Sequence, residues 1–327
     1  MMKKKALITG ITGQSGLFLT RELLKDKDYE IVGISRNKNT KIFYEKLNYL
    51  NVNADELTRL NIVECNLSDP KDISSVINSF KPNYVYNLIG PGSVSESIKF
   101  PNESSAAITN SFDNLVNGLI ENKNFSSFFQ SSSSEMFADG EGKTLDEKSN
   151  FSPLTPYAES KMYCHNLSRE LRNKFDWKIT CGILFNHESE FRPDNYLTMK
   201  IINTAIDIKN GNSKSLTVGS LNLIRDWGYV GDVALAMKKM NENNLSTDYV
   251  VGTGIGRSIE DIINLVFEYL NMDYKNHISI NSSILRDNEP LEIISNPKKI
   301  KKEQNWESIT RFEDMIMRSI KYKEIRV

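Results

Sequence analysis

Residues 5–16 read Lys5-Ala-Leu-Ile-Thr-Gly10-Ile-Thr-Gly13-Gln-Ser-Gly16, and this stretch decides the fold. Its apolar start predicts a buried strand, and a helical pattern begins at Ser15. Glycines three residues apart let the chain turn sharply and approach a pyrophosphate at the positive end of a helix. The stretch therefore predicts a dinucleotide site formed by Gly10, Thr12, Gly13, Gln14, Ser15 and Gly16. The alternative is a glycine-rich turn that binds no ligand.

Short apolar runs alternate with longer helical patterns through the first half of the chain, which is typical of βαβ units around a parallel sheet. The predicted strands are residues 6–9, 30–34, 61–65, 84–88, 127–130 and 179–184. The predicted helices between them are residues 15–25, 41–50, 69–80, 103–121 and 157–175. The predicted fold class is therefore α/β, a Rossmann-like doubly wound parallel sheet.

Beyond residue 186 the alternation becomes looser. Helical patterns remain at residues 196–209, 233–241, 259–270 and 312–322, and strand-like pieces lie at 215–218 and 224–229. We expect a Rossmann domain over residues 1–185, to which a segment of about 220–255 returns. Residues 186–327 are expected to form mainly a smaller, C-terminal substrate-binding lobe.

The composition excludes several classes of protein. Lys and Arg total 41 and Asp and Glu total 42, so the formal charge of -1 provides no overall field that would attract nucleic acid. The mean hydropathy of -0.42 is that of a globular protein. No apolar run approaches the ~18 residues of a membrane helix, and the first residues lack the apolar core of a signal peptide. We expect a cytoplasmic protein without nucleic-acid or membrane partners.

The cysteines and histidines point away from disulfide and metal chemistry. Cys65, Cys164 and Cys181 are widely spaced and form no CxxC pair, which favours a reduced protein over a disulfide scaffold. The three histidines form no metal-binding motif, so no metal site is expected.

The end of the second predicted strand indicates which dinucleotide is bound. An NAD site usually places an Asp or Glu here to hold the ribose 2′-hydroxyl, whereas this chain has Arg36, followed by Lys38. A guanidinium forms a charge-assisted fork with a 2′-phosphate. We therefore expect NADP in preference to NAD, the alternative being a solvated loop arginine.

Tyr157 and Lys161 lie one turn apart in a helical pattern, so they share one face of the predicted helix. A neighbouring ammonium lowers the pKa of a phenol from about 10 toward neutrality and makes it a usable base. Taken alone, such a pair is more often an ordinary surface pair. With the dinucleotide turn, and with the serine run 131–134 ending the fifth strand, it predicts a Ser-Tyr-Lys apparatus for hydride chemistry at a carbinol.

Motifs along nearly the whole chain resemble one known family. They are Gly10-Ile-Thr-Gly-Gln, Gln130-Ser-Ser-Ser-Ser-Glu135-Met-Phe, Ser152-Pro-Leu-Thr-Pro-Tyr157-Ala-Glu-Ser-Lys161, Gly182-Ile-Leu-Phe-Asn186-His187-Glu-Ser and Arg225-Asp-Trp-Gly. The chain resembles the extended short-chain dehydrogenase/reductases that act on nucleotide sugars, and within them the GDP-mannose 4,6-dehydratases. The glycine turn is shared by the whole superfamily, whereas the last two motifs are specific to the dehydratase branch.

The resemblance implies a reaction and a set of catalytic residues. Tyr157 would take the proton of the sugar C4 hydroxyl while hydride leaves C4, with Lys161 lowering the tyrosine pKa and Ser133 hydrogen-bonded to the C4 oxygen. Glu135 would then remove the C5 proton, water would leave from C6, and the hydride would return to C6. The implied product is a 4-keto-6-deoxy sugar and the implied class is a hydro-lyase. The alternative for Glu135 is a solvated or salt-bridged carboxylate.

The same resemblance implies further binding residues, so that residues 1–185 would be an NADP-binding domain and residues 186–327 mainly a nucleotide-sugar-binding lobe. For the cofactor, besides the glycine turn, these are Arg36, Asn66, Leu67, Leu88, Gly90, Tyr157, Lys161, His187 and Arg192. For a GDP-sugar they are Ser93, Asn186, Lys200, Arg225, Arg286 and Glu289. For most of the substrate-side residues singly, a surface or packing role is an equally good interpretation, and their common order along the chain is what favours ligand contact.

The chain departs from the family pattern at several positions. Ser133 stands in place of a threonine, and Ser15 and Asn66 stand in place of aspartates. The largest departure is Gly90-Pro91-Gly92-Ser93, where the family typically has Ala-Gln-Ser-His. Smaller side chains there would make room for a bulkier substituent, so the expected substrate is GDP-mannose or a related GDP-sugar with an N-acetyl group or a heptose side chain.

Two other functions stay open beside the lead prediction of an NADP-dependent nucleotide-sugar 4,6-dehydratase. A 4-dehydrogenase, reductase or epimerase would need Ser133, Tyr157 and Lys161 but not Glu135. A non-catalytic cofactor-binding protein would have no chemical need for any of the four. Relatives commonly pair through two helices, here residues 103–121 and 157–175, so a homodimer or homotetramer is expected.

Overall fold

The computed structural model describes residues 3–37, 39–90, 94–137, 140 and 142–325. The chain divides into two compact units. Unit 1 comprises Met1–Met136, Phe151–Leu184 and Val233–Tyr249, and unit 2 comprises Phe137–Asn150, Phe185–Asp232 and Val250–Val327. The segment that returns to unit 1 is therefore Val233–Tyr249, whereas residues 220–232 belong to unit 2.

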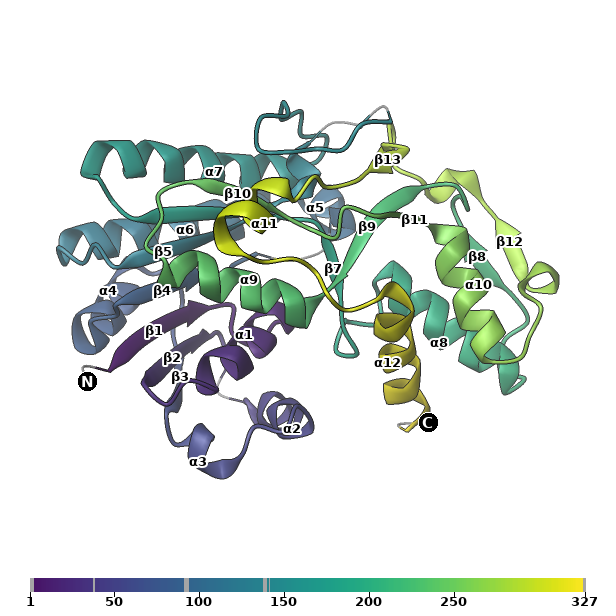
Figure 1. The fold of residues 1–327 in the computed structure, drawn as a ribbon, viewed down its shortest axis with the longest axis horizontal. Helices are drawn as coiled ribbons and strands as arrows, with labels where there is room; N and C mark the ends of the chain where they lie inside the picture. Colours follow the sequence, from purple (N-terminus) through teal and green to yellow (C-terminus); the bar gives the residue numbers. More distant parts are fainter. Residues whose placement is uncertain (1–2, 38, 91–93, 138–139, 141, 326–327) are drawn as a thin grey trace. The chain divides into compact units, whose positions relative to one another are not determined.

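A seven-stranded sheet forms unit 1, in the order β10-β6-β5-β4-β1-β2-β3 (Figure 1). Its strands are β1 Lys4–Thr9, β2 Tyr29–Ser35, β3 Leu60–Glu64, β4 Tyr84–Asn87, β5 Ser127–Ser133, β6 Ile179–Leu184 and β10 Asp248–Val251. Neighbouring strands run parallel, and the strand order reverses between β1 and β4. Such a reversal opens a crevice at the carboxyl ends of the strands. The predicted doubly wound α/β fold is confirmed.

The sequence predicts six of these strands and misses β10. This strand has only four residues, Asp-Tyr-Val-Val, and it pairs at the edge of the sheet with β6 after a long excursion of the chain. The apolar run is too short to stand out locally, since strand pairing between distant segments depends on tertiary contacts. Strand β5 also extends to Ser133, three residues beyond its predicted end, because the serine run continues the ladder with β6.

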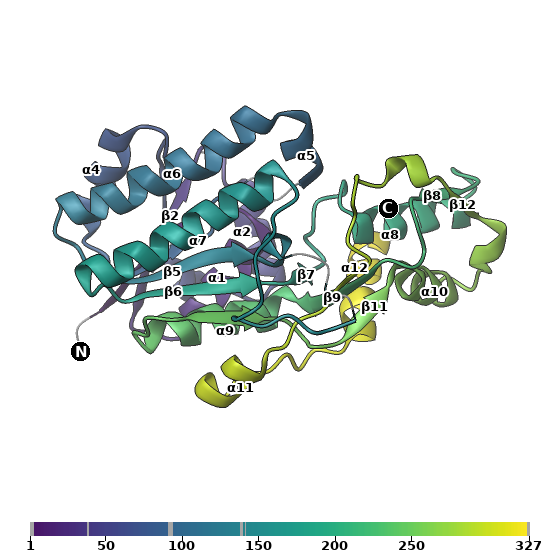
Figure 2. The same cartoon turned by 90° about the horizontal axis from the view of Figure 1, so that it is seen from above.

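Helices cover both faces of this sheet. Figures 1 and 2 show α4, α6 and α7 on one face and α1 and α9 on the other. The helices of unit 1 are α1 Gln14–Leu24, α2 Lys41–Tyr49, α3 Ala54–Leu57, α4 Pro70–Phe80, α5 Val94–Lys99, α6 Pro101–Glu121, α7 Pro156–Phe175 and most of α9 Val230–Glu242. Apolar side chains such as Leu7, Val85, Phe112 and Phe128 form a buried core with those of α4, α6 and α7. This core fixes the helices on the sheet.

Local sequence sets where the site-bearing helix begins. The Thr155 side chain accepts a hydrogen bond from the backbone N–H of Ala158 at 3.2 Å, and Pro156 occupies the first helical position. Both features are typical helix starts, because the hydroxyl satisfies a free N–H and proline needs no donor there. Helix α7 therefore begins one residue before Tyr157.

A four-stranded sheet is the centre of unit 2. Strand β9, Ile224–Tyr229, pairs in parallel with β7, Asn186–Glu188, and with β13, Glu292–Ile293, and antiparallel with β11, Gly256–Ser258. Strands β8 Leu216–Val218 and β12 Ile278–Ile280 form a second, two-stranded sheet. The helices are α8 Leu197–Lys209, α10 Ile259–Tyr269, α11 Lys298–Gln304 and α12 Phe312–Glu324, and the short 3-10 turns of the chain are η1 Ser134–Met136, η2 Tyr274–Asn276 and η3 Ser282–Ile284.

The Asp226 carboxylate holds together two loops of unit 2. It accepts hydrogen bonds from the backbone N–H and hydroxyl of Thr253 at 2.9 and 2.6 Å, and from the N–H of Gly254 at 2.9 Å. Ser295 also donates to it through its hydroxyl. A buried carboxylate needs several donors of this kind. The aspartate of the Arg225-Asp-Trp motif is therefore a structural anchor.

Among the described residues, no helix is both long enough and apolar enough to cross a membrane.

Candidate active site

The glycine turn between β1 and α1 is shaped by close backbone contacts. Gly10 has a φ of +66°, and a Cβ there would lie 2.7 Å from the Leu88 carbonyl oxygen. A Cβ at Gly16 would lie 2.5 Å from the carbonyl oxygen of Ile11. Gly13 is the residue at the start of α1 and offers no side chain to cap it. The N-terminus of α1 is thus an open cradle of the kind that receives a pyrophosphate.

Three buried polar side chains cross the sheet at its carboxyl edge. The Thr9 hydroxyl donates to Asn87 Oδ1 at 2.8 Å, and Asn87 Nδ2 donates to Gln130 Oε1 at 2.7 Å. The Leu88 N–H in turn donates to Thr9 Oγ1 at 3.2 Å. This network joins β1, β4 and β5 at the strand ends, where an α/β sheet binds its ligand, and it keeps the glycine turn in register with β4.

A pocket of about 490 Å³ lies beside the ends of β2 and β3 and is lined by Arg36, Glu64, Cys65, Asn66 and Asp72. Arg36 and Asn66 are exposed there. The predicted partners of the adenosine end thus share one pocket. Its lining also includes two carboxylates.

Leu67 differs from the other predicted adenosine contacts. The Leu67 side chain is packed in the hydrophobic core, and its carbonyl oxygen accepts from Asn114 at 2.9 Å. Leu67 can therefore meet a cofactor only through its backbone. Lys38 and Ser93, together with Pro91 and Gly92, lie outside the described residues.

Lys161 is buried at the end of β5 and β4. Its side-chain Nζ donates to the Ile89 carbonyl at 3.0 Å, to the Ser131 carbonyl at 3.1 Å and to the Ser131 hydroxyl at 3.3 Å. Burial lowers the pKa of Lys161 from 10.5 to about 8. The ammonium lies 5.9 Å from the centre of the Tyr157 ring, so the predicted helical pair does lie side by side.

Ser133 and Glu135 follow one another at the end of β5. Ser133 is the last residue of the strand, and its hydroxyl accepts a hydrogen bond from the Glu135 N–H at 3.2 Å. Glu135 lies in the 3-10 turn Ser134–Met136 and is partly exposed. The Tyr157 N–H donates to the Ser97 hydroxyl at 3.3 Å, which ties the start of α7 to α5. These contacts order the backbone on which the candidate acid and base groups stand.

Gly90 adopts a conformation that suits glycine alone. Its φ is +148°, and a Cβ added to it would lie 3.5 Å from both Cε and Nζ of Lys161. The departure from the family pattern at this position thus lies directly against the buried lysine.

The ion cluster of unit 2 brings together three residues predicted to bind the GDP-sugar. Glu289 Oε1 lies 2.5 Å from Nη2 of Arg225 and 2.5 Å from Nη2 of Arg286, and Glu289 Oε2 also accepts from Arg286 Nε. Burial opposes the charge of Glu289, but the two guanidinium groups outweigh it and hold its pKa below the usual range. Two fixed cations thus share one carboxylate.

The other predicted residues of unit 2 lie around β7 and α8. His187 is half-buried: its Nδ1 lies 2.7 Å from the Phe185 carbonyl oxygen, and burial lowers its pKa to about 4. Arg192 pairs with Glu188 at 3.4 Å, and its guanidinium stacks 3.6 Å from the centre of the Tyr196 ring. Asn186 is half-buried opposite Trp227 on β9, and Lys200 is exposed, with Nζ 3.3 Å from the Thr217 carbonyl oxygen.

Sequence reasoning did not assign roles to four residues that hold the candidate site together. Ser131 supplies two of the contacts to Lys161, Ser97 binds the start of α7, and Ser132 bonds to His165. Ser131 and Ser132 carried a local signal as members of the serine run 131–134. His165 carried another, because it follows Lys161 by four residues and therefore shares its face of the helix.

Comparisons with known proteins agree with this arrangement. The family described as GDP-mannose 4,6 dehydratase matches residues 7–319. The chain belongs to the GDP-mannose 4,6-dehydratase family. Within this family of hydro-lyases, GDP-mannose 4,6 dehydratase 1 of Arabidopsis thaliana is 31% identical over 324 residues, which cover 96% of this chain and 88% of that protein. The predicted resemblance is confirmed.

Two solved structures show the same fold. Pal from Bacillus thuringiensis superposes with a TM-score of 0.87 at 19% identity, covering 99% of this chain and 100% of its own. DesIV, a dTDP-glucose 4,6-dehydratase from Streptomyces venezuelae solved with NAD bound, superposes with a TM-score of 0.84 at 16% identity and covers 98% and 97% of the two chains. At these identities the likeness supports the fold alone.

Proposed function

We propose that this member of the GDP-mannose 4,6-dehydratase family converts GDP-mannose, or a related GDP-hexose or GDP-heptose, to its 4-keto-6-deoxy form, with NADP as cofactor. The observation that carries the proposal is Lys161, a buried ammonium held by Ser131 and Ile89 beside the Tyr157 ring. A surface pair, the alternative interpretation, would not be buried and held in this way. With Ser133 and Glu135 at the end of β5, the chain has a group for each proton-transfer step.

The residues of unit 1 fit a dinucleotide. A Cβ at Gly10 or Gly16 would fill the cradle at the start of α1, and Arg36 lines the pocket beyond β2. When bound, a nicotinamide cofactor would supply the acceptor for hydride from the sugar C4 and the donor that returns it to C6. In the first step Tyr157 accepts the proton of the C4 hydroxyl. The Lys161 ammonium assists, because a positive charge beside a phenol favours the phenolate form. Ser133 donates to the C4 oxygen.

Glu135 supplies the step that separates a dehydratase from a reductase. Once C4 carries a carbonyl group, the C5 proton is acidic, and a carboxylate at the end of β5 would take this proton and pass it to the C6 hydroxyl, which leaves as water. Glu135 is partly exposed and its N–H is fixed on Ser133, so it stands next to the residue that binds the C4 oxygen. In unit 2, we assign Arg225 and Arg286 to the diphosphate and Glu289 to the ribose hydroxyls.

Arg36 supports NADP over NAD. Among the described residues that line the 490 Å³ pocket, Arg36 is the one cation. Its guanidinium would attract a 2′-phosphate, whereas the carboxylates of Glu64 and Asp72 in the same lining would repel it. Arg36→Ala should raise the Kd for NADP about 10-fold or more and leave the Kd for NAD nearly unchanged, since one charge-assisted contact is worth about 1.5–3 kcal/mol. Isothermal titration with both cofactors measures the ratio, and an unchanged ratio would remove the basis for NADP.

Assembly and location are further parts of the proposal. We assign self-association to α6 and α7, where Tyr163 is an exposed large side chain at 43% of its accessible surface. Light scattering should give a dimer or tetramer, and Tyr163→Lys should shift it toward the monomer.

The buried, free cysteines fit a reducing compartment, and we place the protein in the cytoplasm.

The test of the activity is incubation with GDP-mannose and a panel of GDP-sugars, with chromatography of the products and absorbance at 340 nm. We expect 4-keto-6-deoxy product with no net NADPH change. Stoichiometric NADPH change would indicate a reductase or dehydrogenase instead.

Glu135→Gln should keep cofactor binding and lose dehydration. Glu159→Gln, an exposed carboxylate on the first turn of α7, is the matched control and should keep activity.

A further inference from the structure

A buried polar chain links α7 to the strand that carries Ser133. The Ser132 hydroxyl lies 2.8 Å from His165 Nδ1, and His165 Nε2 lies 3.7 Å from Asp248 Oδ2. His165 is fully buried and Ser132 is 3% exposed. Asp248 opens β10, so the chain runs from β5 through α7 to the edge strand of the sheet.

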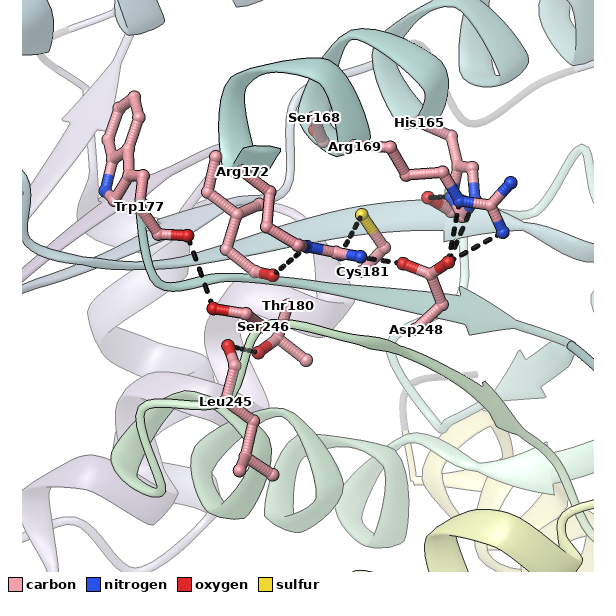
Figure 3. Close-up of polar contacts among 12 residues, drawn as sticks. His165, Ser168, Arg169, Arg172, Trp177, Thr180, Cys181, Leu245, Ser246 and Asp248 are labelled. Atoms are coloured by element: carbon pink, nitrogen blue, oxygen red, sulfur yellow. Dashed lines mark hydrogen bonds and ion pairs between the residues drawn. The ribbon is translucent and has the colours of Figure 1, made fainter. Parts of the chain in front are cut away.

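Two arginines of α7 fix the far end of this chain (Figure 3). Arg169 Nε donates to Asp248 Oδ2 at 2.7 Å, and Arg172 Nη2 donates to Asp248 Oδ1 at 2.8 Å. Arg172 Nε also donates to the Ile179 carbonyl on β6 at 2.9 Å. Asp248 is thus held as a carboxylate: burial opposes its charge, but the two guanidinium groups outweigh it and lower its pKa.

The cluster is not built for a metal. A cysteine sulfur, a histidine nitrogen and a carboxylate oxygen of Cys181, His165 and Asp248 lie within 4.8 Å of one another. A divalent cation there would have to displace both guanidinium groups from Asp248. Burial also raises the pKa of the Cys181 thiol, so the thiolate that a metal needs is disfavoured.

Nor does the cluster form a hydrolytic triad. The order serine, histidine, aspartate is that of a nucleophile with its base, but Ser132 is buried on a central strand, where no substrate can approach. Burial lowers the pKa of His165 to about 4; the Asp248 carboxylate opposes this shift, and the positive charges of Arg169 and Arg172 add to it. His165 is therefore neutral near pH 7 and acts through its hydrogen bond.

The hydrogen bond between Ser132 and His165 lies within the candidate site. Ser132 lies between Ser131, which binds Lys161, and Ser133, the proposed partner of the C4 oxygen. His165 follows Lys161 by one turn of α7. A single side-chain contact thus cross-links the helix with the proton-transferring groups to the strand with their partners.

We propose that His165 is a positioning residue, which through Ser132 sets α7 against the end of β5 so that Tyr157, Lys161 and Ser133 meet the sugar in one geometry. This inference rests on the dehydratase function proposed above. Displacements of about 1 Å in such a site lower a rate by up to about 100-fold. Within the described part of the chain, Nε2 of His165 has no hydrogen-bond partner, and a buried polar atom of this kind destabilises a fold. An apolar replacement can therefore leave the melting temperature nearly intact while the site loosens.

The experiment compares four variants with the wild type, with NADP bound. His165→Phe and Ser132→Ala remove the cross-link, and His165→Asn keeps a polar atom near the place of Nδ1. Ser168→Ala is the matched control, because Ser168 is equally buried on α7 but its hydroxyl bonds only within the helix, to the Cys164 carbonyl at 2.7 Å. The readouts are kcat, KM, the melting temperature and hydrogen exchange of segments 129–137 and 155–163.

For His165→Phe we expect kcat to fall about 10-fold or more, with KM within about two-fold, and exchange in both segments to rise. Ser132→Ala should do the same, the two changes should not add, and His165→Asn and Ser168→Ala should stay near wild type. Unchanged kcat and exchange in His165→Phe would overturn the inference, as would loss of activity in step with melting temperature across all four variants. If the wild type makes no dehydrated product, the proposed function fails, and the exchange data alone still decide whether His165 orders the two segments.

Discussion

The candidate groups of the two units hold their charges in opposite ways. In unit 1, Lys161 is buried among the carbonyl oxygens of Ile89 and Ser131 and a hydroxyl, and its pKa is lowered to about 8. In unit 2, Arg225 and Arg286 share the carboxylate of Glu289 and stay charged at every accessible pH. A cation without a counter-ion can change its proton affinity with its surroundings, whereas a paired guanidinium cannot. In the function proposed above, unit 1 transfers the protons and unit 2 holds the anion.

The largest effect on activity is expected when the buried ammonium of Lys161 is removed. Lys161→Met should lower kcat about 1,000-fold, because the phenolate of Tyr157 loses the charge that favours it. It should at the same time raise the melting temperature, since the buried lysine is held at an unfavourable pKa. Turnover is followed by product chromatography and stability by calorimetry. Retained turnover would mean that Lys161 has no part in the chemistry.

The second prediction concerns stability at low pH, because each unit contains a histidine whose pKa is lowered by burial. The pKa of His165 and that of His187 are each lowered from 6.5 to about 4 by burial. Below pH 6.5 these histidines are protonated in the unfolded chain but not in the folded chain. The free energy of unfolding therefore decreases as the pH falls from 6.5 to 4. Each histidine should contribute on the order of 3 kcal/mol to this loss.

Chemical denaturation at a series of pH values measures this loss. His165→Phe and His187→Phe should each flatten the curve between pH 6.5 and 4, and the double variant should flatten it further. A slope that neither single variant alters would show that other groups control acid unfolding.

The third prediction concerns the paired cations of unit 2. Arg225→Met should raise KM for the GDP-sugar about 10- to 100-fold and change kcat much less, since a charge-assisted contact to the diphosphate is lost before the reaction begins. Initial-rate kinetics separate the two constants. An effect confined to kcat would place Arg225 in the chemistry and remove the contrast between the units.

The smallest expected effect is at Gly90. Gly90→Ala places a side chain at a φ of +148°, which should destabilise the fold by about 1–3 kcal/mol. Because the new methyl group would contact Lys161, activity should also fall a few-fold. Gly142→Ala, at a φ of +77° with open space around it, is the control: it should destabilise the fold but leave activity intact.

Much of unit 1 could be predicted from sequence because its signals are local. The alternation of apolar runs and helical patterns gives the parallel strands from β1 to β6, and the glycine turn follows from three residues at fixed spacing. The pair Tyr157 and Lys161 follows from helical periodicity. Contacts that join distant segments have no such signal: β10 reaches the sheet only after a long return, and nothing near Asp248 in sequence indicates that it meets His165.

Unit 2 was less predictable for the same reason. Its strands β7, β11 and β13 have two or three residues each, too few for a periodic pattern. Asp226 reads from sequence as part of a ligand-binding motif, yet its carboxylate is occupied by Thr253, Gly254 and Ser295. A motif identifies residues with a constrained role, and only the fold shows whether that role is chemical or structural.

The most direct test of the central claim is the fate of hydride taken from the sugar C4. GDP-mannose, or whichever GDP-sugar the panel identifies, is labelled with deuterium at C4 and incubated with enzyme and unlabelled NADP, and the product is analysed by mass spectrometry and NMR. We expect one deuterium at C6 of a 4-keto-6-deoxy sugar, with none left on the cofactor. Deuterium that stays on NADPH or remains at C4 would contradict it.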